Sequence, residues 1–427
     1  MIRLLLPSLI LLSSFCLQAQ RDSLQEELFL LPDLIFESSK DLPQGRSFAL
    51  RVRQPIDHSD PSKGHFYQKA YLLHKGFDRP TVMVTEGYNL RRHRAYETTK
   101  LVDGNQIQVE HRFFGKSIPD SLDYRYLNLT QATADYHHIR QLFDKLYTGK
   151  WLSTGISKGG ATTIMYRYFY PDDIDVGVPV VAPINDELEE DRIYKFLDEV
   201  GTAECRAKIL EVQKAILSRR DEVVPRIKYF AKGAGADFTY LEYEQAFEFS
   251  VLEYPFSFWQ WGADCSKIPT ADAPIDTLLE HFLAVSDVTF FGDGAMEAYA
   301  SHYFQSAQEF GYYGYETDEL KGLLKTFNPG TRPSALFPPN KKAVPFEGEI
   351  LKDVHKWLKK DASQMIYIYG ANDTWTASAV KERKGIDSEW FFMEGKSHGD
   401  ARIKNLTPDE RARMVAAMER WLGMEIE

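Results

Sequence analysis

The sequence predicts an α/β fold with a mostly parallel β-sheet that is interrupted by a large, mainly helical insertion. Short apolar runs alternate with segments of helical spacing up to residue 186 and again from residue 351, as in strands joined by crossover helices. Residues 187–350 contain helical spacing and many aromatic residues but no clear strand alternation. Of the 427 residues, 44% are hydrophobic and 26% are charged, which allows a large core and excludes a disordered or fibrous protein.

The first part of the chain supplies a hairpin, four further strands and two helices. Residues 47–56 and 66–73 alternate apolar and polar side chains around a turn, which predicts a hairpin. Helical spacing predicts helices over 130–146, with Thr130 as the N-cap, and over 161–170. Short apolar runs predict buried parallel strands at 81–85, 107–110, 150–154 and 175–182.

The last part of the chain returns to the strand and helix pattern. Residues 365–370 and 389–393 are predicted strands, and 408–422 have the spacing of an amphipathic helix. The expected domain organisation is therefore a signal peptide, a core in two parts and a helical lid between them, with boundaries at 1–19, 20–186, 187–350 and 351–427.

The N-terminus predicts export. Arg3 precedes an apolar run from Leu4 to Leu17, and Ala19 offers a small-residue cleavage site, which is the pattern of a secretory signal peptide. The run is short for a membrane span, and no later run reaches the ~18 apolar residues that a span needs. We therefore expect a secreted or periplasmic protein without stable membrane association.

Charge and cysteine number exclude further classes. A net charge of −11 argues against nucleic acid as a partner. Three cysteines exclude a disulfide-dense scaffold and a four-cysteine zinc site, and no metal or cofactor is predicted. After cleavage Cys205 and Cys265 remain, and the sequence leaves open whether they form a disulfide or stay as two buried thiols. The oligomeric state is not predicted.

One motif indicates nucleophilic catalysis. Gly155-Ile156-Ser157-Lys158-Gly159 matches Gly-x-Ser-x-Gly and lies between a predicted strand and a predicted helix. This is the context of the nucleophile elbow in the α/β-hydrolase fold, where a strained turn exposes the serine hydroxyl. The sequence therefore predicts that fold, with Ser157 as the nucleophile.

The two partners that a serine nucleophile needs follow Ser157 along the chain. Such a serine requires a histidine base that is oriented by a carboxylate, and in this fold the carboxylate precedes the histidine. Asp373 follows the strand at 365–370, and His398 follows the strand at 389–393. The predicted catalytic triad is therefore Ser157, Asp373 and His398.

Backbone N–H groups are expected to stabilise the oxyanion that forms during acyl transfer. One donor is expected from Lys158, directly after the nucleophile, and the other from the turn at Gly87 and Tyr88 after an early core strand. The Lys158 side chain is expected to make a structural contact.

Several segments carry a family resemblance. The chain resembles the secreted prolyl tripeptidyl and tetrapeptidyl aminopeptidases, and it is more distantly similar to prolyl carboxypeptidase and dipeptidyl peptidase II. The matching segments cover the elbow, the N-terminal hairpin, a Glu-His-Arg-aromatic-aromatic-Gly run and part of the lid, at 155–160, 54–69, 110–115 and 303–313. The relatives have a cysteine in the lid segment where this chain has Ser306 or Ala307, so their disulfide pattern cannot be transferred.

The resemblance implies a serine exopeptidase that removes short peptides from free N-termini and prefers proline before the cleaved bond. A proline ring packs well on aromatic faces, and the lid offers Trp259, Trp261 and Phe304. A free amino group needs a carboxylate partner, for which the candidates are Glu309, Glu253 and Glu86.

Two other functions remain open at this point. A carboxylesterase or lipase can use the same fold and triad, because the fold alone does not choose the acyl group. A binding protein without catalysis would have a damaged triad, and the sequence contains all three residue types in order. The acidic residues among the lid aromatics favour a peptide with a free amino group.

Overall fold

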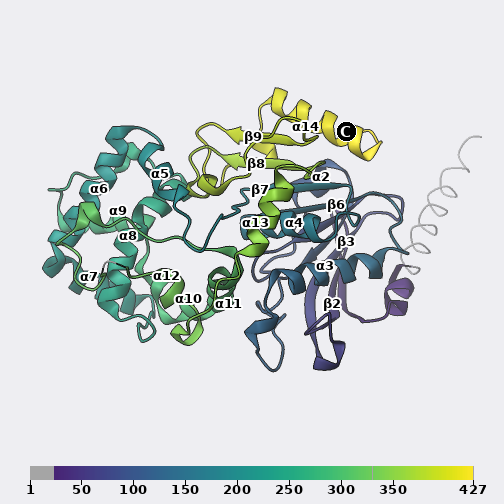
Figure 1. Cartoon of the computed structure of the whole chain (residues 1–427), viewed down its shortest axis with the longest axis horizontal. Helices are drawn as coiled ribbons and strands as arrows, with labels where there is room; N and C mark the ends of the chain where they lie inside the picture. The colour runs from purple at the N-terminus through teal and green to yellow at the C-terminus, as the bar shows by residue number, and fades with distance from the viewer. Residues whose placement is uncertain (1–23, 329, 427) are drawn as a thin grey trace, which may run out of the picture.

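The computed structural model describes residues 24–328 and 330–426, which form a sheet-based core and a helical region at one end of it (Figure 1). The predicted signal peptide, residues 1–19, lies outside the described residues. The chain enters the helical region after the seventh strand and returns to the core before the eighth.

Nine strands form one sheet in the order β1-β2-β3-β5-β4-β6-β7-β8-β9. The pairs β1–β2, β2–β3 and β3–β5 are antiparallel, and the other neighbouring pairs are parallel. This confirms the predicted α/β class with a mostly parallel sheet. The strands are β1 Leu34–Leu42, β2 Gly45–Pro55, β3 His65–His74, β4 Thr81–Thr85, β5 Asn105–Val109, β6 Trp151–Ile156, β7 Val176–Val180, β8 Ile366–Gly370 and β9 Glu389–Met393.

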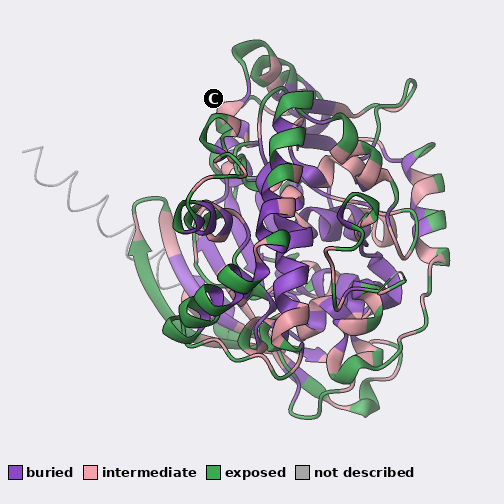
Figure 2. Cartoon of the chain, turned by 90° about the vertical axis from the view of Figure 1, so that its left-hand side faces the viewer, coloured by how far each residue is buried: buried purple, intermediate pink, exposed green. Residues whose placement is uncertain are grey.

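Helices cover both faces of the sheet and bury its central strands. On one face, α14 (Pro408–Leu422) and the region of α2 (Glu97–Leu101) pack against β4 and β6–β9. On the other face lie α3 (Leu129–Phe143), α4 (Lys158–Phe169) and α13 (Glu349–Leu358). Side chains alternate between the two faces along each strand. Because both faces are covered, every residue of β4, β5, β7 and β8 is buried, and buried residues fill the inside of the core (Figure 2).

Two local features differ from the expectations. The sequence pattern predicts no strand at Leu34–Leu42, because most side chains of this edge strand are exposed and give no apolar alternation. The N-cap of α3 is Asn128 rather than Thr130, because the Asn128 side chain accepts a hydrogen bond from the N–H of Gln131.

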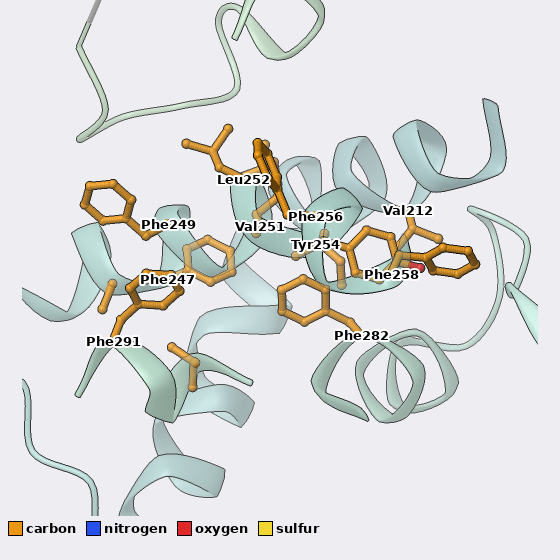
Figure 3. Close-up of a cluster of buried hydrophobic side chains, with 14 of the residues drawn as sticks. Val212, Phe247, Phe249, Val251, Leu252, Tyr254, Phe256, Phe258, Phe282 and Phe291 are labelled. Atoms are coloured by element: carbon orange, nitrogen blue, oxygen red, sulfur yellow. The ribbon is translucent and has the colours of Figure 1, made fainter. Parts of the chain in front are cut away.

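The region between β7 and α13 is helical and has its own core. Its longest helix, α8, carries aromatic residues on several faces, and Phe247, Phe249 and Phe258 are buried among the helices around it (Figure 3). Pro255 removes one hydrogen bond within α8, and the side chain of Gln213 donates to the carbonyl of Val251. The helices of this region are α5 Arg192–Glu199, α6 Ala203–Ser218, α7 Arg220–Gly233, α8 Tyr243–Trp261, α9 Ile275–Val285, α10 Asp293–Ala298, α11 Ala300–Gln305 and α12 Pro333–Leu336.

Cys205 and Cys265 form a disulfide that links the start of α6 to the segment after α8. Of the two alternatives that the sequence leaves open, the structure therefore contains the disulfide. The bridge closes a sequence separation of 60 residues within the helical region.

Replacing both cysteines by serine (C205S/C265S) is expected to destabilise the helical region by about 2–4 kcal/mol, because the unfolded chain regains the entropy that the bridge removes. Scanning calorimetry of the oxidised protein should give a lower Tm for the variant. Reductant should lower the Tm of the unaltered protein and leave that of the variant unchanged. Equal Tm values for the two oxidised proteins would contradict a stabilising role.

Candidate active site

Ser157 lies at a strained turn between β6 and α4. Its backbone has φ 59° and ψ −127°, a conformation that non-glycine residues rarely adopt. A Cβ atom on Gly159 would lie 2.5 Å from the carbonyl oxygen of Thr85, and one on Gly160 would lie 2.8 Å from the Cβ of Ala182. These two glycines are therefore required by close packing, and the turn has the geometry of a nucleophile elbow.

The turn after β4 packs directly against this elbow. A Cβ atom on Gly87 would lie 2.6 Å from both the backbone nitrogen of Gly159 and the Cβ of Lys158. Within the described part of the chain, the backbone N–H groups of Tyr88 and Lys158 donate to no other group. Two free donors thus lie on the segments that meet beside Ser157, where the sequence predicts the oxyanion donors.

Asp373 and His398 are brought together at the carboxyl ends of β8 and β9. His398 Nδ1 and Asp373 Oδ2 lie 2.6 Å apart, and the Asp373 side chain is fully buried. The other oxygen of Asp373 accepts a hydrogen bond from the N–H of Trp375. The carboxylate is therefore oriented, and it holds the imidazole in one position.

The helical region supports both of these loops through the end of α8. The backbone N–H of His398 donates to the carbonyl of Gln260, and the hydroxyl of Thr374 donates to the carbonyl of Phe256. Arg402 donates to the carbonyl of His398. The loops with Asp373 and His398 are thus fixed by α8 as well as by the sheet.

Ser157 and His398 open into one cavity of about 640 Å³ between the core and the helical region. Most of its lining is apolar or aromatic, and Lys158, Glu253, Asp287 and Arg402 are its acidic and basic residues other than histidine. Its aromatic lining consists of Tyr88, Trp261, Phe290, Phe291, Tyr299, Tyr303, Phe310, Tyr312, Tyr313 and Trp375. The cavity therefore suits a ligand with an apolar body and a few charged groups.

Glu253 presents a buried carboxylate to this cavity. It lies on α8, and its oxygens accept hydrogen bonds from the hydroxyls of Tyr313 and Tyr315. Burial raises its pKa to about 7, because a carboxylate loses hydration in an apolar site. Within the described residues, no cation pairs with it, so it is suited to bind a cation supplied by a ligand.

The predicted substrate-binding residues do not all reach the cavity. Trp261 lines it, with its ring 6.0 Å from that of His398. Trp259 is buried against Phe258 in the core of the helical region, and Phe304 stacks on Tyr124 outside the cavity lining. Of the three predicted aromatic residues, the structure thus brings only Trp261 to the cavity.

Neither Glu86 nor Glu309 lines the cavity. Glu86 accepts hydrogen bonds from the hydroxyl of Tyr96 and the amide of Gln108. These bonds connect the turn after β4 to neighbouring segments of the core. Glu309 is buried beside Gln305, and burial raises its pKa to about 8. The structure therefore does not bring these two candidate carboxylates into the cavity that contains Ser157 and Glu253.

The sequence interpretation missed the hydroxyl groups that orient Glu253. Tyr313, the last residue of the segment 303–313, and Tyr315 form the pattern Tyr-Gly-Tyr, and nothing in that pattern indicates a carboxylate partner. Within residues 24–328 and 330–426, no group of three or more His, Cys, Asp or Glu side chains is arranged to hold a metal ion.

The sheet, the elbow and the loops at its carboxyl edge define an α/β-hydrolase. The family model of the PS-10 peptidase S37 matches residues 20–426, and the chain belongs to this family of serine peptidases. It is an enzyme that acts on peptides. This excludes the hypothesis of a binding protein without catalysis and disfavours the esterase alternative. This confirms the resemblance given by the sequence motifs.

Two relatives and two solved structures illustrate the comparison. The chain is 34% identical to the prolyl tri/tetrapeptidyl aminopeptidase of Streptomyces mobaraensis over 95% of this chain and 86% of that protein. It is 33% identical to the serine protease vicPb of Bipolaris victoriae over 29% of this chain and 25% of that protein. The proline iminopeptidase of Mycobacterium smegmatis aligns with 13% identity over 87% of this chain and 97% of that one, at a TM-score of 0.40. VinJ aligns with 12% identity over 87% and 98% of the respective chains, at a TM-score of 0.43.

The close packing of the elbow can be tested with Gly159→Ala. The added methyl group collides with the Thr85 carbonyl, and such overpacking is expected to lower the free energy of unfolding by at least about 1–3 kcal/mol. Chemical denaturation should measure the loss. Gly149→Ala is the matched control, because the nearest atom to its Cβ lies 3.7 Å away. Equal stability of the two variants would show that the elbow tolerates a side chain.

Proposed function

We propose that this protein is an exported serine exopeptidase that releases di-, tri- or tetrapeptides from free N-termini and prefers proline before the cleaved bond. The observation that carries the proposal is the shared cavity, which holds Ser157 and His398 together with the buried carboxylate of Glu253. The name of the Streptomyces mobaraensis relative, a prolyl tri/tetrapeptidyl aminopeptidase, supports the same substrate class.

The proposed reaction is acyl transfer through Ser157. His398 removes the proton from the hydroxyl as the oxygen attacks the carbonyl carbon, and Asp373 stabilises the imidazolium that forms. The N–H groups of Lys158 and of the Gly87–Tyr88 turn stabilise the negative oxygen of the tetrahedral intermediate. The leaving amine then takes the proton from His398, and water hydrolyses the acyl-enzyme by the same route.

The proposed role of Glu253 is to bind the free amino group of the substrate. An ammonium beside the carboxylate favours its ionised form and compensates for the hydration that burial removes. A blocked N-terminus offers no charge, so it leaves Glu253 buried without a cation, which is unfavourable. The aromatic lining offers flat faces on which a proline ring can pack.

Export and the division into domains form part of the same proposal. Residues 1–19 would be removed as a signal peptide, and residues 187–350 would act as a lid that determines specificity. No helix among the described residues has the length and apolar character required to span a membrane.

Replacing Ser157, Asp373 or His398 by alanine is expected to lower kcat by at least ~10³-fold, because each acts in the same proton transfer and attack. Hydrolysis of Xaa-Xaa-Pro chromogenic amides by the mature protein measures the effect. Ser153→Ala is the matched control, since Ser153 lies on the same strand and its buried hydroxyl has no hydrogen-bond partner. Near-normal kcat in a folded S157A variant would overturn the proposal.

The exopeptidase part is tested by parallel assays of substrates with free and blocked N-termini and of fatty-acid esters. We expect cleavage only of peptides with a free amino group. Equal rates on blocked and free peptides would contradict the proposed requirement for a free N-terminus. Cleavage of esters alone would favour the esterase alternative.

Glu253→Gln is expected to weaken binding of a product peptide with a free N-terminus by about 10–100-fold, as for the loss of a charged hydrogen-bond partner. In the unaltered enzyme the affinity should fall as the pH drops through about 7, where Glu253 takes up a proton, and E253Q should lack this dependence. Inhibition constants measured between pH 5.5 and 8.5 give both results. Glu244→Gln, at a half-exposed position on α8, serves as the control.

A measurement of stability shows whether a loss of peptide affinity in E253Q comes from misfolding. Because the pKa of Glu253 is raised from 4.5 to about 7 in the folded protein, the fold loses stability as the pH rises from about 4.5 to about 7, and the loss is complete above that pH. The Tm of E253Q at pH 8 should therefore equal or exceed that of the unaltered protein.

A loss of peptide affinity in E309Q instead of E253Q would reassign the amino-group site to Glu309.

A further inference from the structure

The Lys158 side chain is buried and makes one specific hydrogen bond. Its Nζ donates to the carbonyl oxygen of Gly87 at 2.9 Å, and only 5% of the residue is exposed. The ammonium group also lies 5.6, 5.2 and 5.1 Å from the ring centroids of Tyr88, Phe114 and Phe310. These contacts hold the nitrogen in one place. Burial lowers the pKa of the Lys158 ammonium to about 7, and both the ammonium and the neutral amine have N–H groups that can donate to the Gly87 carbonyl.

This hydrogen bond determines the orientation of a neighbouring N–H group. The carbonyl of Gly87 and the N–H of Tyr88 belong to one peptide unit, which is planar and trans, so they point in opposite directions. A carbonyl that is bound to Lys158 therefore keeps the Tyr88 N–H on the other side. The next carbonyl, that of Tyr88, accepts a hydrogen bond from the N–H of His111, so both neighbouring carbonyls are restrained.

We propose that Lys158 is a positioning residue that orients the second donor of the oxyanion hole: its ammonium group binds the Gly87 carbonyl and thereby directs the N–H of Tyr88 toward the site beside Ser157. This inference rests on the proposed acyl transfer at Ser157. Lys158 then has two roles in the oxyanion hole. Its backbone N–H is the first donor, and its side chain orients the second donor, the N–H of Tyr88.

The restraint is needed because the residue that bears the carbonyl is glycine. Gly87 has no side chain, since one would collide with the elbow, and glycine has access to more backbone conformations than other residues. A rotated peptide would turn the Gly87 carbonyl toward the developing negative charge. The site would then lose a donor and gain a repulsive dipole, and the loss of one such donor typically lowers kcat by ~10²–10³-fold.

Lys158→Met tests the inference, because methionine keeps an apolar stem of similar length and removes the donor. We expect kcat for an Xaa-Xaa-Pro amide to fall by ~10–10³-fold with little change in KM, since the lost interaction acts in the transition state. A peptide boronate, which mimics the tetrahedral intermediate, should bind more weakly by a similar factor. A product peptide should bind as before.

Lys69→Met is the matched control. Lys69 donates through Nζ to the carbonyl of Leu90 at 2.8 Å, in the same loop but away from the Gly87–Tyr88 peptide, so its loss should leave kcat and boronate binding unchanged. An equal fall in K69M would assign the effect to loop order in general and overturn the inference. Equal weakening of product and boronate binding in K158M would also overturn it.

Two further outcomes separate the inference from the proposed function. If S157A is inactive and folded K158M keeps a kcat within threefold of the unaltered enzyme, the positioning role is wrong and the proposed function stands. If S157A remains active, the proposed function itself fails. Should K158M not fold, Lys158→Gln provides the same comparison of kcat, product binding and boronate binding with a polar side chain.

Discussion

The site depends on the close contact of glycine backbones where β6 turns into α4. Gly87, Gly155 and Gly159 lie so near to one another or to Thr85 that no side chain fits on any of them. This contact brings the turn after β4 against the residue that follows Ser157. Because the carboxyl ends of parallel strands share one edge, Asp373 and His398 reach the same place from β8 and β9.

The parts of the site that the sequence predicts are those that depend on local pattern. The elbow is a strand, a turn and a helix in direct succession, and Asp373 and His398 each follow a recognisable buried strand. Their order along the chain then limits the choice among the histidines. Of the histidines after Ser157, His355 lies on α13, where it hydrogen-bonds the carbonyl of Asn185, and it does not line the cavity.

The substrate side of the cavity depends on which way each side chain of the lid helices points, and composition does not determine this. Trp259 and Trp261 are two positions apart on α8, so they project about 200° apart around the helix axis. The first is buried, and the second is 62% exposed beside His398. Among the carboxylates, Glu253 on α8 lines the cavity, whereas Glu309 is buried beside Gln305 and does not line it.

The end of α8 has a consequence for how this enzyme can diversify. Its last carbonyls bind the loops of Asp373 and His398, and Gly262 packs against Ser397. The helical region is therefore not a detachable module, since exchanging it as a whole would remove a support of the proposed base. Changes in α9 to α12 can reshape the cavity without that penalty. New substrate preferences would then arise by altering the outer helices around a retained α8.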